Sequence, residues 1–269
     1  MGRLKLPAVY GGLTVLAGIT AESPGTVALS LGLSLFIPAL FLLTARESLT
    51  TALITSVLSL GVLALYSLRA PLDVAYFQAL GALFYKTLKR PAAAVLGGAL
   101  ILFLGAVVEE LLFGLPQEVK ELPLFGSYRW GLYFFVGAIL AEIAYALAQV
   151  VYGLKEGEGK NPFFTLRFGF WPVALFLITG ALTLVAGGAL KVVSVNLLAV
   201  SLGLFTAQGL SVIAYLVSRL SPLWRLLTAL GALIFPVGLF VTALIVGFLD
   251  NWLDFRKLSG GGSNGSNSA

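Results

Sequence analysis

A carboxylate stands in the middle of a long apolar run of this sequence. Glu142 falls near the centre of residues 130–154, and Tyr145 and Gln149 follow it at i+3 and i+7. At 100° per residue, these three side chains share one face of a helix. A carboxylate at mid-bilayer depth costs at least about 2.5 kcal/mol, so it needs a partner, a cavity or a pore. The stripe predicts a small-molecule cavity or a proton path, or else a protonated Glu142 that joins a neighbouring helix.

Two amides stand inside another apolar run. Gln208 lies near the middle of residues 195–217, and Asn196 lies at the start of that run. Uncharged amides bind small polar ligands, and they also join neighbouring helices by hydrogen bonds. The candidate ligand-binding residues are therefore Glu142, Tyr145, Gln149, Asn196 and Gln208, and helix packing is the alternative role for each.

A charged cluster closes the last apolar run. Asp250 and Asp254 are spaced i, i+4, which places them on one face of a helix, and Arg256 follows closely. Such a group could bind a cation, a lipid headgroup or a protein partner. The alternative is a solvated helix end anchored at the membrane surface by Trp252. Asp250, Asp254 and Arg256 are therefore candidate interface residues.

The composition restricts the chemistry that these residues can perform. The 269 residues include no Cys and no His, which excludes disulfides, thiolate nucleophiles, imidazole catalysis and the usual His–carboxylate metal centres. The sequence contains no nucleophile elbow and no Gly-rich phosphate loop. Lys and Arg occur singly or in pairs rather than in a basic stripe, so nucleic acid is not expected as a partner. We expect no catalytic residue, no metal site, no cofactor and no enzymatic activity.

The elements that carry these residues are predicted to be membrane-spanning helices. Hydrophobic residues make up 59% of the chain and charged residues 11%, and the mean hydropathy is +0.99. A soluble domain has about 25% charged residues, and a spanning helix needs about 20 mostly apolar ones. Apolar runs cover residues 8–21, 26–44, 49–68, 92–113, 130–154, 170–190, 195–217 and 226–249. The predicted fold class is therefore all-α, a polytopic transmembrane helical bundle of eight or nine spans.

The uncertain segment is residues 72–88, which contain Asp73, Gln78 and Lys86. Three structures fit it: a tilted span, a re-entrant segment or an interfacial amphipathic helix. With nine spans, Lys and Arg favour the side of the N-terminus, which would then be cytoplasmic; with eight spans they favour neither side. The side of the C-terminus therefore depends on this segment.

The predicted spans form one transmembrane domain, residues 1–258. A polar loop around residues 155–160 could divide it into halves, 1–154 and 163–258. Residues 259–269 contain only Gly, Ser, Asn and Ala, which is typical of a flexible linker or a cloning remnant.

The last third of the chain carries a further pattern. It consists of Phe168-Gly-Phe-Trp-Pro172, Val195-Asn196-Leu197, Phe205 with Gln208-Gly209-Leu210, Gly247-Phe-Leu-Asp250 and Asp254-Phe-Arg256. This pattern resembles the YybS-like family of bacterial multi-span membrane proteins, a domain of unknown function. That family is similar in turn to the S components of energy-coupling-factor vitamin transporters. The resemblance covers residues 163–257, so Glu142 lies outside it.

The resemblance implies a helical bundle in the bacterial cytoplasmic (inner) membrane that buries a small molecule. It also implies docking on a coupling subunit through small residues of the first helix, here Ala8, Gly12 and Ala17. S components usually have six helices, fewer than the apolar runs of this chain. The expected function is small-molecule binding or transport, and the alternative is a non-transporting scaffold or assembly factor. Expected partners are membrane lipid, a small-molecule ligand and a membrane protein.

Overall fold

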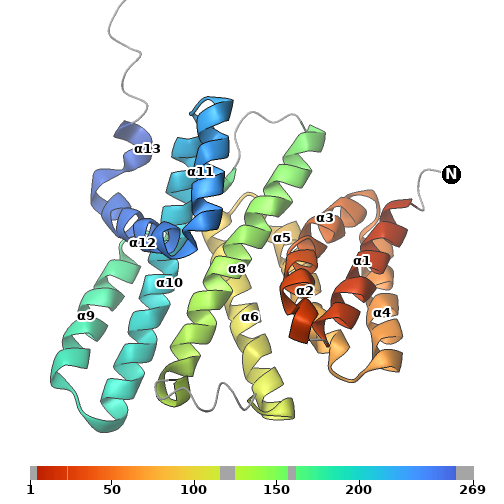
Figure 1. Cartoon of the computed structure of the whole chain (residues 1–269), viewed down its shortest axis with the longest axis horizontal. Coiled ribbons are helices and arrows are strands. Elements are labelled where there is room, and N and C mark those ends of the chain that lie inside the picture. Colours follow the sequence, from red (N-terminus) through yellow and green to blue (C-terminus); the bar gives the residue numbers. More distant parts are fainter. Residues whose placement is uncertain (1–4, 23, 116–124, 157–161, 259–269) are drawn as a thin grey trace, which may run out of the picture. The chain divides into compact units, whose positions relative to one another are not determined.

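The structure is a computed structural model that describes residues 5–22, 24–115, 125–156 and 162–258 (Figure 1). The described residues form helices and connections and contain no strand, which confirms the all-α fold class. Proline stands in the first turn of several helices, where its missing N–H leaves no intrahelical bond unmade. These prolines are Pro71, Pro91, Pro172, Pro222 and Pro236.

The chain divides into two compact units. Unit 1 comprises Met1–Gly126 and Val136–Phe163, and unit 2 comprises Ser127–Phe135 and Phe164–Ala269. The division after Phe163 lies close to the start of the predicted second half. Unlike the predicted halves, the units share α8 (Phe125–Glu156), because the early part of this helix belongs to unit 2.

Unit 1 contains the predicted runs up to residue 113 and the part of the run 130–154 that begins at Val136. Its helices are α1 (Lys5–Ala21), α2 (Val27–Ser34), α3 (Ile37–Glu47), α4 (Leu49–Tyr66), α5 (Ala70–Thr87), α6 (Pro91–Phe113) and most of α8. The predicted run 26–44 is interrupted at Leu35 and Phe36, because Pro38 has no N–H to continue the hydrogen-bond ladder of α2 and stands instead in the first turn of α3. The Ser48 side chain begins α4 by accepting a hydrogen bond from the Thr51 backbone N–H at 3.2 Å.

The uncertain segment 72–88 is the helix α5, and it lies inside unit 1. It packs against α1, α3, α4 and α6. Its buried face includes Val74, Phe77, Leu80 and Phe84. A Cβ atom on Gly81 would lie 2.6 Å from the Cβ of Phe41, so α3 and α5 approach closely because this position is a glycine.

Short connections define two ends of unit 1. End A contains the starts of α1, α4 and α6 and the ends of α3, α5 and α8. End B contains the ends of α1, α4 and α6 and the starts of α2 and α5. Since α4 ends at Tyr66 and α6 begins at Pro91, the eighteen residues of α5 lead from end B back to end A (Figure 1).

Unit 2 contains the remaining helices. They are α9 (Trp171–Val185), α10 (Gly188–Ser218), α11 (Pro222–Ile234), α12 (Pro236–Leu253) and the short α13 (Phe255–Leu258). The prediction of one helix over residues 226–249 is wrong, because the chain breaks at Phe235 and begins a new helix at Pro236. Proline cannot continue the hydrogen-bond ladder of the preceding helix.

Six helical segments within the described residues are long and apolar enough to cross a membrane. They are Val27–Glu47, Leu49–Tyr66, Pro91–Phe113, Phe125–Tyr152, Gly188–Ser218 and Pro236–Leu253. The apolar helix Trp171–Val185 is shorter. These segments are compatible with an integral membrane protein, and the total of eight or nine spans stays a prediction.

Two glycines allow α10 and α12 to cross with their backbones in contact. A Cβ atom on Gly209 would overlap the carbonyl group of Ala243, and one on Gly247 would overlap the carbonyl oxygen of Phe205. Small residues at such crossings permit close helix packing within a membrane.

This crossing predicts the effect of one added methyl group. Gly209→Ala should destabilise unit 2 by about 2 to 3 kcal/mol, because overpacking forces the helices apart. Thermal unfolding of the detergent-solubilised protein measures the effect. Gly180→Ala in α9 is the matched control, since a Cβ there meets no atom within 4 Å. Equal melting temperatures for the two variants would contradict the close crossing.

Candidate functional site

The predicted polar stripe of α8 lies in unit 1, and two of its members bind the same backbone carbonyl. The Tyr145 hydroxyl and the Gln149 amide both donate hydrogen bonds to the Leu88 carbonyl oxygen, the latter at 2.7 Å. Leu88 is the residue that ends α5, where carbonyl groups lack intrahelical partners. Tyr145 and Gln149 therefore join α8 to the end of α5.

Glu142 lies one turn earlier on α8. Its residue is 1% exposed, so the carboxyl group is inside unit 1. The neighbouring Ala141 packs against α6 at Gly98, where an added Cβ would come within 2.7 Å of the alanine Cβ. The role predicted for Glu142, in a cavity, in a proton path or in joining helices, stays a prediction.

Asn196 joins two helical segments of unit 2. Its side-chain oxygen accepts a hydrogen bond from the Gly131 backbone N–H at 2.6 Å, and its amide donates to the Ser127 carbonyl at 2.9 Å. Asn196 therefore ties α10 to the early part of α8. The five predicted ligand-binding residues divide between the units, with Glu142, Tyr145 and Gln149 in unit 1 and Asn196 and Gln208 in unit 2.

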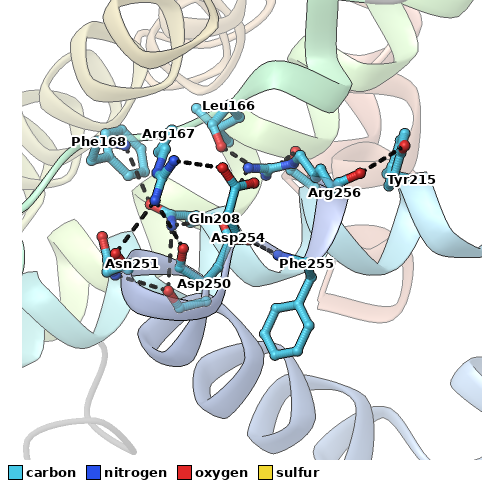
Figure 2. Close-up of polar contacts among 12 residues, drawn as sticks. Leu166, Arg167, Phe168, Gln208, Tyr215, Asp250, Asn251, Asp254, Phe255 and Arg256 are labelled. Carbon is cyan, nitrogen blue, oxygen red and sulfur yellow. Dashed lines mark hydrogen bonds and ion pairs between the residues drawn. The ribbon is translucent and has the colours of Figure 1, made fainter. Parts of the chain in front are cut away.

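A buried ion pair organises the C-terminal part of unit 2 (Figure 2). Asp250 is fully buried, and its carboxylate accepts a hydrogen bond from the Arg256 guanidinium at 2.9 Å. The same carboxylate accepts from the Gln208 amide at 3.0 Å and from the Phe255 backbone N–H at 3.1 Å. Gln208 also accepts from the Phe168 backbone N–H at 3.2 Å. Its amide is thus fully engaged in linking α10, α12 and the segment before α9.

Arg256 extends this cluster across unit 2. Its guanidinium donates to the Leu166 carbonyl at 2.9 Å and to the Ser211 hydroxyl at 3.3 Å. Burial lowers the pKa of Arg256 and the ion pair with Asp250 opposes that effect, while guanidinium groups remain charged in proteins. The cluster includes Phe168, Gln208, Asp250 and Arg256, which are among the positions of the quoted C-terminal pattern.

Asp254 forms the outer rim of the cluster. It adopts a left-handed backbone conformation (φ 44°) that ends α12, so Asp250 and Asp254 do not continue one helix as their spacing suggested. Its carboxylate lies 3.0 Å from Lys257 and 3.3 Å from Arg167. Of the predicted interface residues, Asp250 and Arg256 form hydrogen bonds with residues inside unit 2, and Asp254 lies at the rim of the cluster.

A polar hollow opens at end A of unit 1. It has a volume of about 530 Å³ and is lined by Pro7 of α1, Thr44 and Glu47 of α3, Ser48, and Thr51 of α4. Cavities of roughly 300 to 1,000 Å³ hold small molecules in proteins. Three hydroxyl groups and one carboxylate here provide both hydrogen-bond donors and acceptors.

Buried polar pairs continue inward from this hollow along α4. The Tyr10 hydroxyl lies 2.6 Å from the Ser56 hydroxyl, and the Gln78 amide donates to the Ser59 hydroxyl at 3.0 Å. Ser59 in turn donates to the Ser56 carbonyl at 2.9 Å. The hollow and these pairs form the polar axis of unit 1, carried by α1, α4 and α5.

The polar axis is not among the sites predicted from the sequence. The signal that could have found it is the density of hydroxyl residues in an otherwise apolar run, namely Ser48, Thr50, Thr51, Thr55, Ser56 and Ser59. Hydroxyls contribute little to hydropathy, and in transmembrane helices they commonly bond to their own backbone, so they attract less notice than a carboxylate. The site predicted in this part of the chain was instead based on the charge of Glu142.

Carboxylates gather at end B. Glu22 accepts a hydrogen bond from the Ser67 hydroxyl, and Asp73 lies 3.8 Å from Arg69. Glu109 of α6 lies close enough to Asp73 to interact with it electrostatically.

Comparisons of the chain with family models, curated proteins and solved structures find no match.

The buried ion pair predicts a large effect of removing one partner. Asp250→Ala should destabilise the protein by about 3 kcal/mol, because it leaves the Arg256 guanidinium buried without its counter-ion. Thermal unfolding in detergent measures the loss. Lys257→Ala is the control, since that side chain is 84% exposed and its ion pair should contribute less than about 1 kcal/mol. The ion pair would be unimportant if both variants unfolded at the same temperature.

Asp254 predicts a change of stability in acid. The hydrogen bond from Lys257 lowers the pKa of Asp254 below its ordinary value of 3.8, and Arg167 acts in the same direction. Because the folded pKa is depressed, this contribution is complete above the ordinary pKa and disappears as the pH falls through the lower value. Asp254→Asn, which still permits a left-handed backbone, should therefore lower the melting temperature slightly at pH 6, and this difference should shrink as the pH falls below the ordinary pKa of 3.8. A difference that stayed constant with pH would contradict this role.

Proposed function

We propose that this chain is a multi-pass integral membrane protein that binds a small polar molecule through the polar axis of unit 1. It would act as a binding component or a permease and catalyse no reaction. The observation that carries the proposal is the hollow of about 530 Å³ at end A, with the hydroxyl groups of Thr44, Ser48 and Thr51 around it. The bacterial cytoplasmic membrane and the likeness to S components are part of the same proposal.

The outer surfaces of the helices support a membrane location. Leu65 of α4 and Val185 of α9 are 89% and 83% exposed, and Val57 and Leu111 are also largely exposed. Exposed apolar side chains in such numbers cannot remain in water without association. Lipid chains would cover them.

The path of α5 supports six crossings in unit 1. At about 1.5 Å per residue, its eighteen residues extend about 27 Å, close to the thickness of the hydrocarbon layer. It would cross together with α1, the α2–α3 pair, α4, α6 and α8. Asp73 and Lys86 would then lie near the two surfaces, where charged groups reach water.

The chemistry of the lining suggests a class of ligand. Glu47 is the charged residue of the described lining, and the other polar groups are hydroxyls. A neutral or cationic molecule that donates several hydrogen bonds would suit these acceptors, whereas an anion would meet the Glu47 carboxylate. Vitamins, nucleobases and amino acids include molecules of this size and polarity.

The scaffold alternative has its own supporting observation. Arg167 and Lys257 remain exposed around Asp254, so the rim of the C-terminal cluster could bind a charged partner. Asp250 and Arg256, in contrast, are occupied within unit 2. The alternative therefore depends on the rim alone.

A ligand panel tests the proposed function. One member of a panel of vitamins, nucleobases and amino acids should raise the melting temperature, since a ligand at 100 times its Kd stabilises by about 2.7 kcal/mol. Thr51→Leu should abolish the shift, because Thr51 lines the hollow. Thr50→Leu is the matched control, as Thr50 is exposed and is not among the lining residues.

Two results would overturn this assignment. A shift that survives Thr51→Leu but disappears in Glu142→Ala would move the site to the stripe of α8. Absence of any shift, together with a membrane-protein partner that is lost on Asp254→Ala, would favour the scaffold.

A further inference from the structure

The two ends of unit 1 carry opposite charge. Among the described side chains, end A has the basic residues Lys5, Arg46, Lys86, Lys89 and Arg90 and the acidic residue Glu47. End B has the acidic residues Glu22, Asp73, Glu109 and Glu110 and the basic residue Arg69. Basic residues concentrate at the cytoplasmic surface of membrane proteins, where anionic lipids also give the membrane a negative potential.

The structure brings the basic residues of end A together around the last turns of α8. The Arg46 guanidinium lies over the Tyr152 ring, 5.2 Å from its centroid. On the same face of α8, Tyr145 and Gln149 hold the carbonyl of Leu88. Positions 145, 149 and 152 follow one another at helical spacing. The end of α3 and the α5–α6 connection are thus fixed to adjacent turns of one helix.

This arrangement gathers Arg46 with the basic residues of the α5–α6 connection. Lys86, Lys89 and Arg90 stand on either side of Leu88, and all four basic side chains are exposed. We call Arg46, Lys86, Lys89 and Arg90 the basic group of end A. Clustered Lys and Arg side chains bind phosphate oxygens by charge-assisted hydrogen bonds.

Apolar surface lies next to this group. Tyr85, which precedes Lys86 on α5, is 44% exposed, and Val150 is exposed beside Gln149 on α8. A soluble anion would make no favourable contact with these apolar side chains. The acyl chains of a phospholipid would cover them while its phosphate group reached the basic residues.

We propose that the basic group of end A binds the phosphate groups of anionic phospholipids at the cytoplasmic surface. The acidic end B would then face the opposite side of the membrane. This inference is independent of the ligand-binding hollow, because none of Arg46, Lys86, Lys89 and Arg90 is among its lining residues.

Reconstitution in vesicles tests lipid binding directly. The full chain is incorporated into vesicles of phosphatidylcholine alone or of phosphatidylcholine with phosphatidylglycerol, and thermal unfolding is followed in each. Phosphatidylglycerol should raise the melting temperature, and the combined variant Lys86→Gln, Lys89→Gln, Arg90→Gln should lose most of that shift. Arg69→Gln at end B is the matched control and should retain it. The transition in phosphatidylcholine alone shows whether each variant is folded.

Two further arms identify the source of the phosphate and the orientation. Inorganic phosphate added to phosphatidylcholine vesicles should give no shift; an equal shift would overturn the lipid assignment. Because the chain contains no Cys, Thr50→Cys and Leu68→Cys introduce unique thiols at ends A and B. In intact bacterial cells, a membrane-impermeant maleimide should label Leu68→Cys and spare Thr50→Cys. The reverse pattern, or a phosphatidylglycerol shift unchanged in the combined variant, would overturn the proposal.

Discussion

The need to pair buried polar groups inside the protein governs the arrangement of this chain. A carbonyl or guanidinium group that is buried between packed helices and lacks a protein partner loses the hydrogen bonds that water would provide. The Leu88 carbonyl at the end of α5 therefore receives two donors from α8, and the Asp250 carboxylate receives donors from Gln208, Phe255 and Arg256. Each of these groups fixes the end of one helix against the side of another. The hydrogen bonds therefore set the positions of helices that apolar packing alone would allow to slide past one another.

Much of the fold could be predicted from the sequence, because hydropathy and proline act locally. The helices α4, α6 and α8 lie where the sequence has apolar runs of spanning length, and proline stands in the first turn of α5 and α6. Local signals fail where the outcome depends on neighbours. Nothing in residues 72–88 shows that four helices surround them, and the break at Phe235 depends on how strongly a proline interrupts a continuous apolar run.

The candidate sites were predicted less well, and for a physical reason. Charge reveals that a residue needs a partner, and it identified Glu142, Asp250 and Arg256, but it does not reveal which partner. The partner of Asp250 is Arg256 of the same unit, six residues along the chain beyond the break at Asp254. The hollow at end A is lined by Ser48 and Thr51, and hydroxyl residues of this kind are common in apolar helices. These two line a hollow only because three helices leave a space between them, which the sequence does not show.

The sharing of α8 between the two units has a consequence for dissecting the protein. A fragment cut after residue 154 would take residues 127–135 away from unit 2, and Asn196 would lose the Gly131 N–H and Ser127 carbonyl that it binds. The complementary fragment would therefore begin with an incomplete interior. A split-protein reporter would therefore need its junction before residue 125, so that α8 stays whole on the C-terminal piece. The N-terminal piece would then lack the helix that holds the α5–α6 connection in unit 1.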